Sequence, residues 1–255
     1  MSVSQHLKQI EEDYDVKVLE AREFGSRAWN LETPESDHDV AFIFVEPVER
    51  YISLESYRET IDRHFGEDFQ YMGWNLKTYL EHLYNCKPTA IEFLLSPEAH
   101  LSRIDMLDLR RYMLSNFNEV ALYYHYRNLG KNQYKRYLEK GQKTTVKRNL
   151  YVFRGLLYAQ YIKEVRDFPM LNFPDFVKMG RDSNFFDQEE IWRTITDIVD
   201  KKKKGMNVDI GVPHRKWIEK KIEEDIDTDR ADNMDREVLD DFLFEWLNGE
   251  TNEFR

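Results

Sequence analysis

The chain has 255 residues, of which 41% are hydrophobic and 14% aromatic, and its formal net charge is −11 at pH 7. This composition excludes a disordered chain, and the length allows one large or two small domains with a substantial core. No run approaches the roughly 18 apolar residues of a membrane helix, and residues 1–10 lack the plan of a signal peptide. Because the single cysteine, Cys86, cannot form an internal disulfide, we expect a cytoplasmic protein.

The charge is distributed unevenly along the chain. Residues 121–166 contain eleven Lys or Arg against Glu139 and Glu164, a net charge of +9, which leaves −20 for the remainder. An acidic chain is a poor partner for a long duplex, because nucleic-acid backbones are bound through excess positive charge. The basic segment still permits contact with a short nucleic-acid end.

The first hundred residues alternate predicted strands and helices. Pro47 ends the second strand, because proline cannot donate to a strand ladder. The order predicts a small mixed sheet with helices on its faces. The expected elements are a helix over 4–13, a strand over 15–23, a short helix opening at Gly25-Ser26, a strand over 37–45, a helix near 54–64, a strand over 68–74 and a helix over 76–85.

From residue 102 onward the pattern is helical, with few strand signals. We therefore predict an α+β fold in which residues 1–101 form a sheet domain and residues 102–255 form a helical domain. The last thirty residues or so are expected to be an acidic extension of that domain. The expected helices lie near 104–117, 119–128, 132–139, 144–165, 188–203, 214–224 and 236–247.

The stretch from Gly25 to Phe44 holds the most informative motif. A Gly25-Ser26 turn is followed by a spacer, then by Asp37 and Asp39 at the head of an apolar run. Residues i and i+2 of a strand share a face, so the two carboxylates are expected side by side. Carboxylate oxygens suit Mg²⁺. A small-residue pair alone is usually a turn and an Asp-x-Asp alone is usually a cap, but the ordered combination is more specific.

The stretch resembles the GS–SDxD signature of the DNA polymerase β nucleotidyltransferase superfamily, and more closely its bacterial and phage RNA-repair-pathway branch. The resemblance covers roughly residues 10–225 and leaves the last thirty outside. It implies a nucleotidyltransferase-type, palm-like sheet domain followed by a helical domain. It also implies two Mg²⁺ ions, with Mn²⁺ as the alternative, and a nucleoside triphosphate such as ATP. The resemblance is carried further by residues 50–54, 73–77, 91–97, 147–154 and 202–205.

The resemblance assigns roles to residues of the motif. Asp37 and Asp39 match the first two carboxylates that bind metal and support catalysis. Gly25, Ser26 and the adjoining Arg27 match the turn that holds phosphate of the nucleotide. These five residues form the first part of the predicted site.

The third carboxylate departs from the family pattern. Gln70 and Asn75 stand where acids are expected, and an uncharged amide would weaken metal binding. Asp68 shares a strand face with Gln70 by alternation, so we predict Asp68 as the third metal ligand. Two further departures are Asn30, which stands where relatives tend to have glycine and tolerates a left-handed backbone, and Ala41, which stands where some have arginine.

A basic stripe follows one side of the helix expected over 144–165. Lys147, Tyr151, Arg154 and Tyr158 recur at helical spacing, and this pattern alone indicates a solvated basic face beside a core face. The resemblance matches Lys147, Tyr151 and Arg154 to a family motif. It implies that they bind the nucleotide or an acceptor phosphate.

Three other features allow a structural or a functional interpretation. Tyrosines and cations interleave over residues 123–127 and 134–137, which suits stacking on bases but also suits a core. The Lys201–Lys204 run is most simply a solvated helix end. His38 is expected on the strand face opposite the two aspartates, as a structural or surface residue.

The leading hypothesis is a cytoplasmic, Mg²⁺-dependent nucleotidyltransferase. It moves a nucleoside monophosphate from a triphosphate to a hydroxyl by two-metal in-line attack on the α-phosphate. The acceptor is an RNA end, a small molecule or a protein side chain, and a protein acceptor would make the chain a regulator of a toxin or host factor. The alternative, motivated by Gln70 and Asn75, is a degenerate relative that binds nucleotide or a partner without turnover. No membrane partner is expected.

Overall fold

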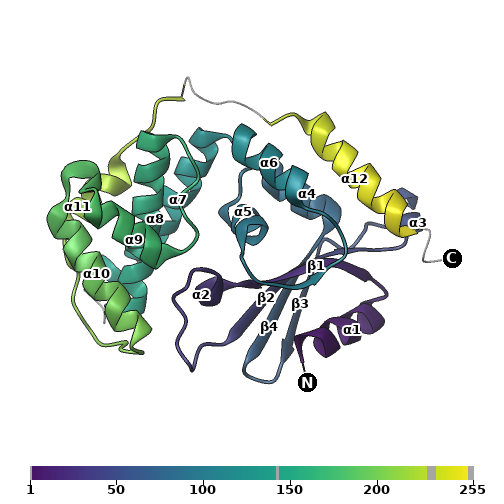
Figure 1. Ribbon diagram of the computed structural model, residues 1–255, viewed down its shortest axis with the longest axis horizontal. Helices are drawn as coiled ribbons and strands as arrows, with labels where there is room; N and C mark the ends of the chain where they lie inside the picture. Colours follow the sequence, from purple (N-terminus) through teal and green to yellow (C-terminus); the bar gives the residue numbers. More distant parts are fainter. Residues whose placement is uncertain (1, 142–143, 229–233, 252–255) are drawn as a thin grey trace. The chain divides into compact units, whose positions relative to one another are not determined.

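The computed structural model describes residues 2–141, 144–228 and 234–251 (Figure 1). They form two compact units. The first unit takes its described residues from 1–28, 37–117 and 233–255, and the second from 29–36 and 118–232. The boundary expected after residue 101 lies inside the first unit.

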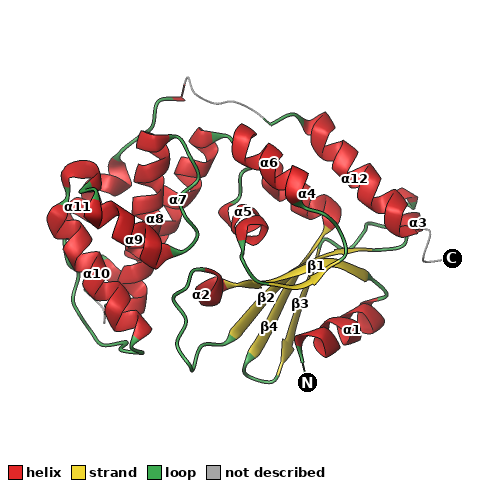
Figure 2. Ribbon diagram, viewed as in Figure 1, coloured by secondary structure: helices red, strands yellow, loops and turns green. Residues whose placement is uncertain are grey.

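The first unit contains every strand of the described chain and the helices around them (Figure 2). Its elements are α1 (Val3–Tyr14), β1 (Lys17–Phe24), α2 (Gly25–Ala28), β2 (His38–Val45), α3 (Val48–Ile52), β3 (Thr60–Phe65), β4 (Phe69–Asn75), α4 (Leu76–Tyr84), α5 (Pro88–Leu95), β5 (Ala99–Ser102), α6 (Leu107–Asn116) and α12 (Arg236–Thr251).

The strands described form one mixed sheet in the order β3-β4-β2-β1-β5. β1 is antiparallel to β2 and β5, β2 is parallel to β4, and β3 is antiparallel to β4. Helix α1 covers one face and helices α4 and α5 cover the other. Leu7 and Ile10 of α1 pack on Val18, Phe42 and Phe44, which are buried because alternate strand residues face the same side. The α+β prediction is confirmed.

Most elements of this unit match the sequence prediction, but one was wrong and three were missed, the short helix α3 among them. Residues 60–65 form strand β3, not the end of a helix, because Ile61 is buried between two exposed neighbours while the segment pairs with β4. Helix α5 begins with Pro88 and is buried nearly all round, so it has no amphipathic pattern to detect. The short edge strand β5 was also missed.

The second unit is helical. Its central helix, α8, contacts α7, α10 and α11 and buries residues on all sides, including the polar Asn149 and Gln160. Glycines allow helices α7 and α8 to approach closely. A Cβ on Gly155 would lie only 2.7 Å from the backbone nitrogen of Gly130. The elements are α7 (Glu119–Gln133), a π-helical turn η1 (Tyr134–Leu138), α8 (Val146–Val165), α9 (Phe173–Asp182), a 3₁₀ turn η2 (Phe185–Asp187), α10 (Glu189–Lys203) and α11 (Arg215–Glu223).

The spacer of the GS–SDxD motif belongs to this helical unit. The chain leaves the first unit after Ala28 and returns at Asp37. The carbonyl of Trp29 accepts a hydrogen bond of 3.1 Å from the amide of Phe173, which anchors the spacer to α9, a helix that the sequence did not predict. In the described part of the chain, no helix combines the length and apolar character needed to cross a membrane.

Candidate functional site

The turn after β1 holds Gly25 against Asp39. Gly25 has φ +61°, and a Cβ built on it would collide with Oδ2 of Asp39. The register places Phe24 opposite Asp39, so the turn lies at the head of β2. Glycine is required here both for its left-handed backbone and for its missing side chain. The structure therefore brings together two residues of the predicted site.

Asp37 and Asp68 lie at the same end of the sheet. Asp37 precedes β2 and is exposed, and its carbonyl accepts a 3.2 Å hydrogen bond from Nε of Arg27. Asp68 is exposed in the turn before β4, and its carbonyl accepts a 2.7 Å bond from the amide of His38. Parallel pairing of His38 with Phe69 sets Asp68 beside Asp37. Among the described residues, however, the three predicted carboxylates are not a group whose ligand atoms all lie within 4.8 Å.

The two amides found in place of acids have different surroundings. Gln70 is exposed and pairs directly with Asp39 across the parallel strands. Asn75 is fully buried as the N-cap of α4, where its Oδ1 accepts from the amide of Lys77 and the hydroxyl of Tyr51, both at 3.1 Å. Burial raises the pKa of Tyr51 to about 12, which keeps that hydroxyl a donor. The N-cap role explains why position 75 is an asparagine and not an acid. No contact described for Gln70 explains the amide at position 70.

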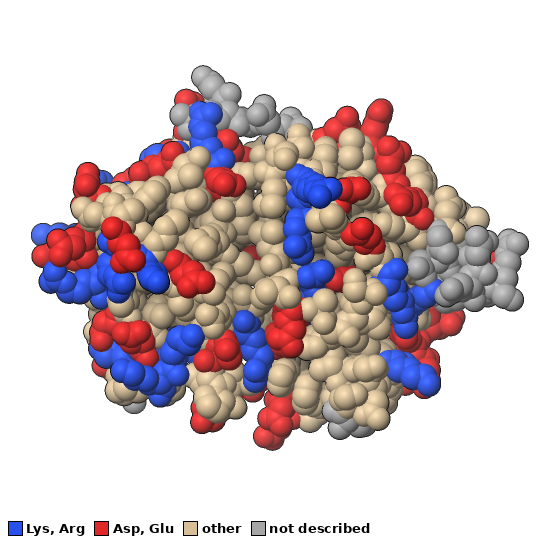
Figure 3. Space-filling model, viewed as in Figure 1, with Lys and Arg blue, Asp and Glu red and all other residues tan. Residues whose placement is uncertain are grey.

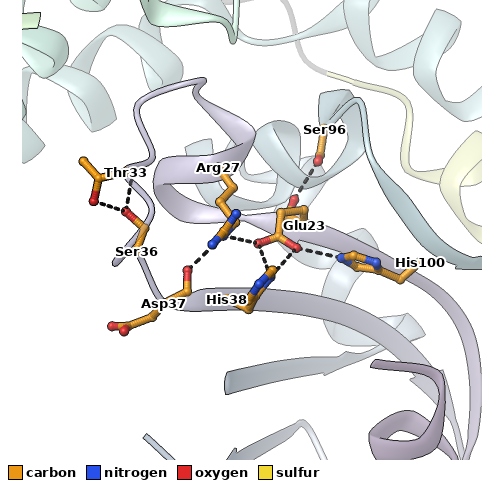
Figure 4. Close-up of polar contacts among 8 residues, drawn as sticks. All are labelled: Glu23, Arg27, Thr33, Ser36, Asp37, His38, Ser96 and His100. Carbon is orange, nitrogen blue, oxygen red and sulfur yellow. Dashed lines mark hydrogen bonds and ion pairs between the residues drawn. The ribbon is translucent and has the colours of Figure 1, made fainter. Parts of the chain in front are cut away.

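A second acidic group lies on the other face of the sheet. Glu23 pairs with Val40, one residue from the Phe24–Asp39 pair, so its side chain points away from Asp39. Its carboxylate lies 2.7 Å from Nε2 of His100, 3.4 Å from Nδ1 of His38 and 3.5 Å from Nε of Arg27 (Figure 4). We call Glu23, Arg27, His38 and His100 the Glu23 cluster.

The Glu23 cluster is a structural feature that sequence reasoning missed. Glu23 is 1% exposed, and the ring of His38 stacks on Phe69 with centroids 4.9 Å apart. The prediction of a structural His38 is confirmed. His100 lies in the unpredicted strand β5, so no local pattern could have paired it with Glu23. Arg27, predicted to bind nucleotide, has its guanidinium turned toward Glu23 in Figure 4, while the carboxylate of Asp37 points away.

Two groups of side chains differ in the metal ions that they suit. Glu23, Glu98 and His100 each offer one ligand atom, all within 4.8 Å of one another. A histidine nitrogen among the ligands suits transition metals, and Arg27 already compensates part of the charge of Glu23. Asp37 and Asp39 offer only oxygen donors, which fit Mg²⁺. The close packing of Gly25 on Asp39 holds that carboxylate at the head of β2, which agrees with a ligand site there.

In the second unit, Arg154 and Tyr151 are gathered around Trp29 of the motif spacer. The guanidinium of Arg154 lies 3.7 Å from the centroid of the Trp29 ring, and the Tyr151 ring lies 5.9 Å from it. Arg154 is only 7% exposed and Tyr158 is fully buried. The solvated basic face expected from the sequence was therefore wrong for these two residues, because the spacer and α9 cover that side of α8.

Lysines of α8 and α10 lie near the same spacer. Lys147 is exposed, as expected. Burial, and then the positive charge of Lys147, lower the pKa of Lys202, whereas Glu32 opposes that change. Nζ of Lys203 donates a 3.2 Å hydrogen bond to Asn30, whose φ of +57° confirms the expected left-handed turn. The lysine run is thus more than a solvated helix end, since Lys202 is half-buried.

The tyrosines interleaved with cations belong mostly to the core. Tyr123, Tyr126 and Tyr134 are at most 3% exposed, and burial raises the pKa of Tyr123 to about 12. Nη1 of Arg127 donates to the carbonyl of Glu224 at 2.8 Å. These residues therefore stabilise the helical unit. On the face drawn in Figure 3, acidic and basic side chains are interspersed.

The proteins that resemble this chain include one curated relative and one solved structure. It is 31% identical over 222 residues to the uncharacterized protein YcgL of Bacillus subtilis (strain 168), covering 85% of this chain and 83% of that protein. A crystal structure of a nucleotidyltransferase-like protein from Exiguobacterium sibiricum 255-15 covers 80% of this chain and 74% of its own, at 13% identity. Its TM-score of 0.34 is too low to support an argument.

A family described as the RNA repair pathway DNA polymerase beta family matches residues 1–248. The match includes most of α12, which packs on α4 in the first unit. The expectation that the last thirty residues lie outside the resemblance was therefore wrong. The predicted resemblance itself is confirmed over nearly the whole chain. The chain belongs to the RNA repair pathway DNA polymerase beta family, which places it among the polymerase β-type nucleotidyltransferases.

Proposed function

We propose that this chain transfers a nucleoside monophosphate from a nucleoside triphosphate to a hydroxyl group. The acceptor oxygen forms a bond to the α-phosphorus, the bond to pyrophosphate breaks, and the hydroxyl proton is released. Family membership supports the reaction class. The observation that carries the proposal is the packing of the Asp39 carboxylate on Gly25, beside the exposed Asp37.

In this proposal Asp37 and Asp39 hold Mg²⁺, with Mn²⁺ as the alternative and Asp68 as the third ligand. Two bound ions would neutralise charge on the triphosphate and activate the acceptor hydroxyl. The protein orders the ligands through its backbone, because Arg27 binds the carbonyl of Asp37 and the amide of His38 binds that of Asp68. These bonds leave both exposed carboxylates pointing outward from a fixed backbone.

We assign the nucleotide contacts to two sets of residues. Gly25, Ser26 and Arg27 form the turn that packs on the Asp39 carboxylate, and we assign the phosphate contacts of the first unit to this turn. In the second unit, Lys147 supplies an exposed charge, and Tyr151 and Arg154 are held by Trp29. The single cysteine supports action in the cytoplasm, where thiols stay reduced.

The central test measures Mg²⁺-dependent pyrophosphate release from each of the four ribonucleoside triphosphates. We expect release by the wild-type protein, and a loss of at least about a hundredfold in the Asp37→Asn, Asp39→Asn double variant, because several kcal/mol of charge stabilisation is removed. Asp62→Asn is the matched control, since Asp62 is an exposed carboxylate of β3 outside the site. Equal release by the wild-type and double variants would refute the proposal.

The acceptor is identified with triphosphate labelled at the α-phosphate. Label transferred to an RNA oligonucleotide, to a small molecule or to a protein in a lysate separates the three acceptor classes. The overall acidic charge makes a short RNA end the only nucleic-acid acceptor that we propose.

One observation favours a second candidate, a binding protein without turnover. Gln70 stands directly beside Asp39 and gives that position no negative charge. In that case nucleotide would bind the wild-type protein without pyrophosphate release under any acceptor condition. Substitution of Gln70 by Glu would then be expected to strengthen Mg²⁺-dependent nucleotide binding, which equilibrium dialysis would measure.

A further inference from the structure

A cavity of about 480 Å³ lies in the first unit, where the chain passes from β5 to α6. Arg22, Arg103 and Arg110 line it, together with the acidic Asp105. None of the predicted site residues is part of its lining. Arg22, its lining residue on β1, is three residues before Gly25, which is about 10 Å along the strand at about 3.3 Å per residue. The cavity is therefore separate from the GS–SDxD turn.

Arg110 is the arginine of this cavity that has no counter-ion. Its Nη2 donates to the carbonyl of Leu94 at 2.6 Å, while its buried Nε has no hydrogen-bond partner. Within the described ranges, no carboxylate lies within ion-pair distance of its guanidinium. Burial, and then the positive charge of Arg22, lower the pKa of Arg110, and they outweigh the opposite influence of Tyr79 and Glu20. A half-buried cation next to a like charge needs an anion to offset the cost of its burial.

The other two arginines are fixed in place by the protein. Arg22 lies 2.7 Å from Glu20 and donates to the carbonyl of Ser96 at 2.6 Å. Arg103 donates to the carbonyl of Val18 at 2.8 Å and pairs with Glu11 on α1. Fixed guanidinium groups lose little side-chain entropy when they bind an anion, and their planar donors match the oxygens of phosphate.

Three acids, Glu11, Glu20 and Asp105, lie beside the three arginines and balance them in formal charge, but none of them pairs with Arg110. Burial raises the pKa of Glu20, so the protein environment disfavours the charge of the one carboxylate that pairs with Arg22. Asp105 is occupied as well, because its Oδ1 accepts a 2.8 Å hydrogen bond from the amide of Leu107 at the start of α6. The N-cap residue Met106 offers no side-chain acceptor to that helix. Arg110 therefore remains the one guanidinium of the cavity lining without a carboxylate at ion-pair distance among the described residues.

We propose that this cavity binds the phosphate group of a small ligand, with Arg110 as the main electrostatic contact. Inorganic phosphate, pyrophosphate and the terminal phosphate of a nucleotide share this chemistry. Phosphate is favoured over a carboxylate because its additional oxygens can accept from more than one of the three guanidinium groups. The site does not depend on the proposed nucleotidyl transfer and could be present in a protein without turnover.

Isothermal titration calorimetry without divalent metal tests the site. The probes are inorganic phosphate, pyrophosphate and ADP, with adenosine as the uncharged control. We expect Arg110→Gln to weaken binding of the phosphate probes at least about tenfold, the effect of one charge-assisted hydrogen bond. Arg111→Gln is the matched control, because Arg111 is the next residue of α6, is exposed and pairs with Asp108.

The Asp37→Asn, Asp39→Asn variant separates this proposal from the proposed function. It should bind the phosphate probes like the wild-type protein even if it releases no pyrophosphate. Equal affinity of wild-type and Arg110→Gln proteins, or no binding by the wild-type protein at millimolar ligand, would overturn the site. Tight binding of adenosine would overturn the assignment to phosphate.

A second measurement uses the unsubstituted protein, in case Arg110→Gln does not fold. Phenylglyoxal modifies accessible guanidinium groups, and mass spectrometry then gives the extent of labelling at each arginine. We expect saturating pyrophosphate to protect Arg110 and to leave Arg111 unprotected. Labelling of Arg110 that is unchanged by pyrophosphate would contradict the proposal.

Discussion

The two faces of the sheet hold acidic residues in opposite ways. On one face, Glu23 is buried and lies within 3.5 Å of two histidines and an arginine. Near the other face, Asp37 is exposed and Asp39 packs on a glycine. Glu23 and Asp39 belong to adjacent pairs of the β1–β2 ladder, because Glu23 pairs with Val40 and Phe24 pairs with Asp39. A buried carboxylate that contacts an arginine and two histidines stabilises the fold, whereas one at an open strand end can bind a cation from solution.

The largest expected effect is that of Gly25→Ala. The new Cβ would collide with Asp39 and would also occupy a left-handed backbone. We expect pyrophosphate release to fall at least a hundredfold, by displacement of the carboxylate. Gly66→Ala is the matched control, because Gly66 has φ +68° but no atom near its Cβ position. That variant should lose only about 1 kcal/mol of stability, with unchanged activity. Equal activity losses in the two variants would mean that backbone strain, not Asp39, is responsible.

Glu23→Gln should lower mainly the stability of the protein, whereas Asp39→Asn should lower mainly its activity. Loss of the Glu23 charge leaves Arg27 without its buried partner, so we expect the free energy of unfolding to fall by about 2–3 kcal/mol. Pyrophosphate release should stay within about threefold of wild type. Asp39→Asn should lower release by up to about a hundredfold with little change in stability. Urea unfolding and the pyrophosphate assay measure both properties, and an inactive but stable Glu23→Gln protein would instead place Glu23 in the catalytic site.

A similar contrast separates two arginines of α8. Arg154 lies buried over Trp29, whereas Arg148 lies 4.5 Å from the centroid of the half-exposed Tyr137 ring. We expect Arg154→Gln to lower stability by about 1–2 kcal/mol and Arg148→Gln by about 0.5 kcal/mol, because desolvation strengthens cation–π contacts. Thermal unfolding of the two variants gives the comparison. Equal losses would show that the Trp29 contact contributes no more than an exposed pair.

The sequence predicted the elements whose residue patterns are local. Strands β1 and β2 and the turn between them follow from alternation and from the small residues at Gly25 and Ser26. The contact of Gly25 with Asp39 was not predicted, because it joins residues 14 positions apart and the spacer between them belongs to the second unit. Residues 60–65 were assigned to a helix because pairing with β4, which decides the strand, is not local. Helix α5 lacks an exposed face and so lacks periodicity.

Contacts between distant segments could not be predicted from one sequence. The approach of Arg154 to Trp29 joins residues 125 positions apart, and it changes a residue expected on a solvated face into a buried one. Asn75 was interpreted as a lost acid, although the cap that it forms at α4 explains it. The role of such a side chain depends on which residues contact it in the folded protein. One sequence does not show those contacts.

The smallest expected effect concerns Glu20, the second buried glutamate of β1. Burial raises the pKa of its carboxyl above the ordinary value of 4.5, so the folded protein binds this proton more tightly than the unfolded chain does. The stability that this group contributes is therefore fully present below about pH 4.5 and is lost as the pH rises through the folded pKa. Glutamine cannot titrate, so Glu20→Gln should gain stability relative to wild type over that range.

Urea unfolding of wild type and Glu20→Gln between pH 4 and pH 8 measures the difference. Glu12→Gln, at an exposed side chain of α1, controls for the loss of one negative charge. A difference in unfolding free energy that stays constant with pH, or that favours wild type increasingly as the pH rises, would mean that Arg22 stabilises the charged form of Glu20 more than burial opposes it. Glu20 would then offset more of the positive charge near Arg110 and weaken the attraction of that cavity for a phosphate.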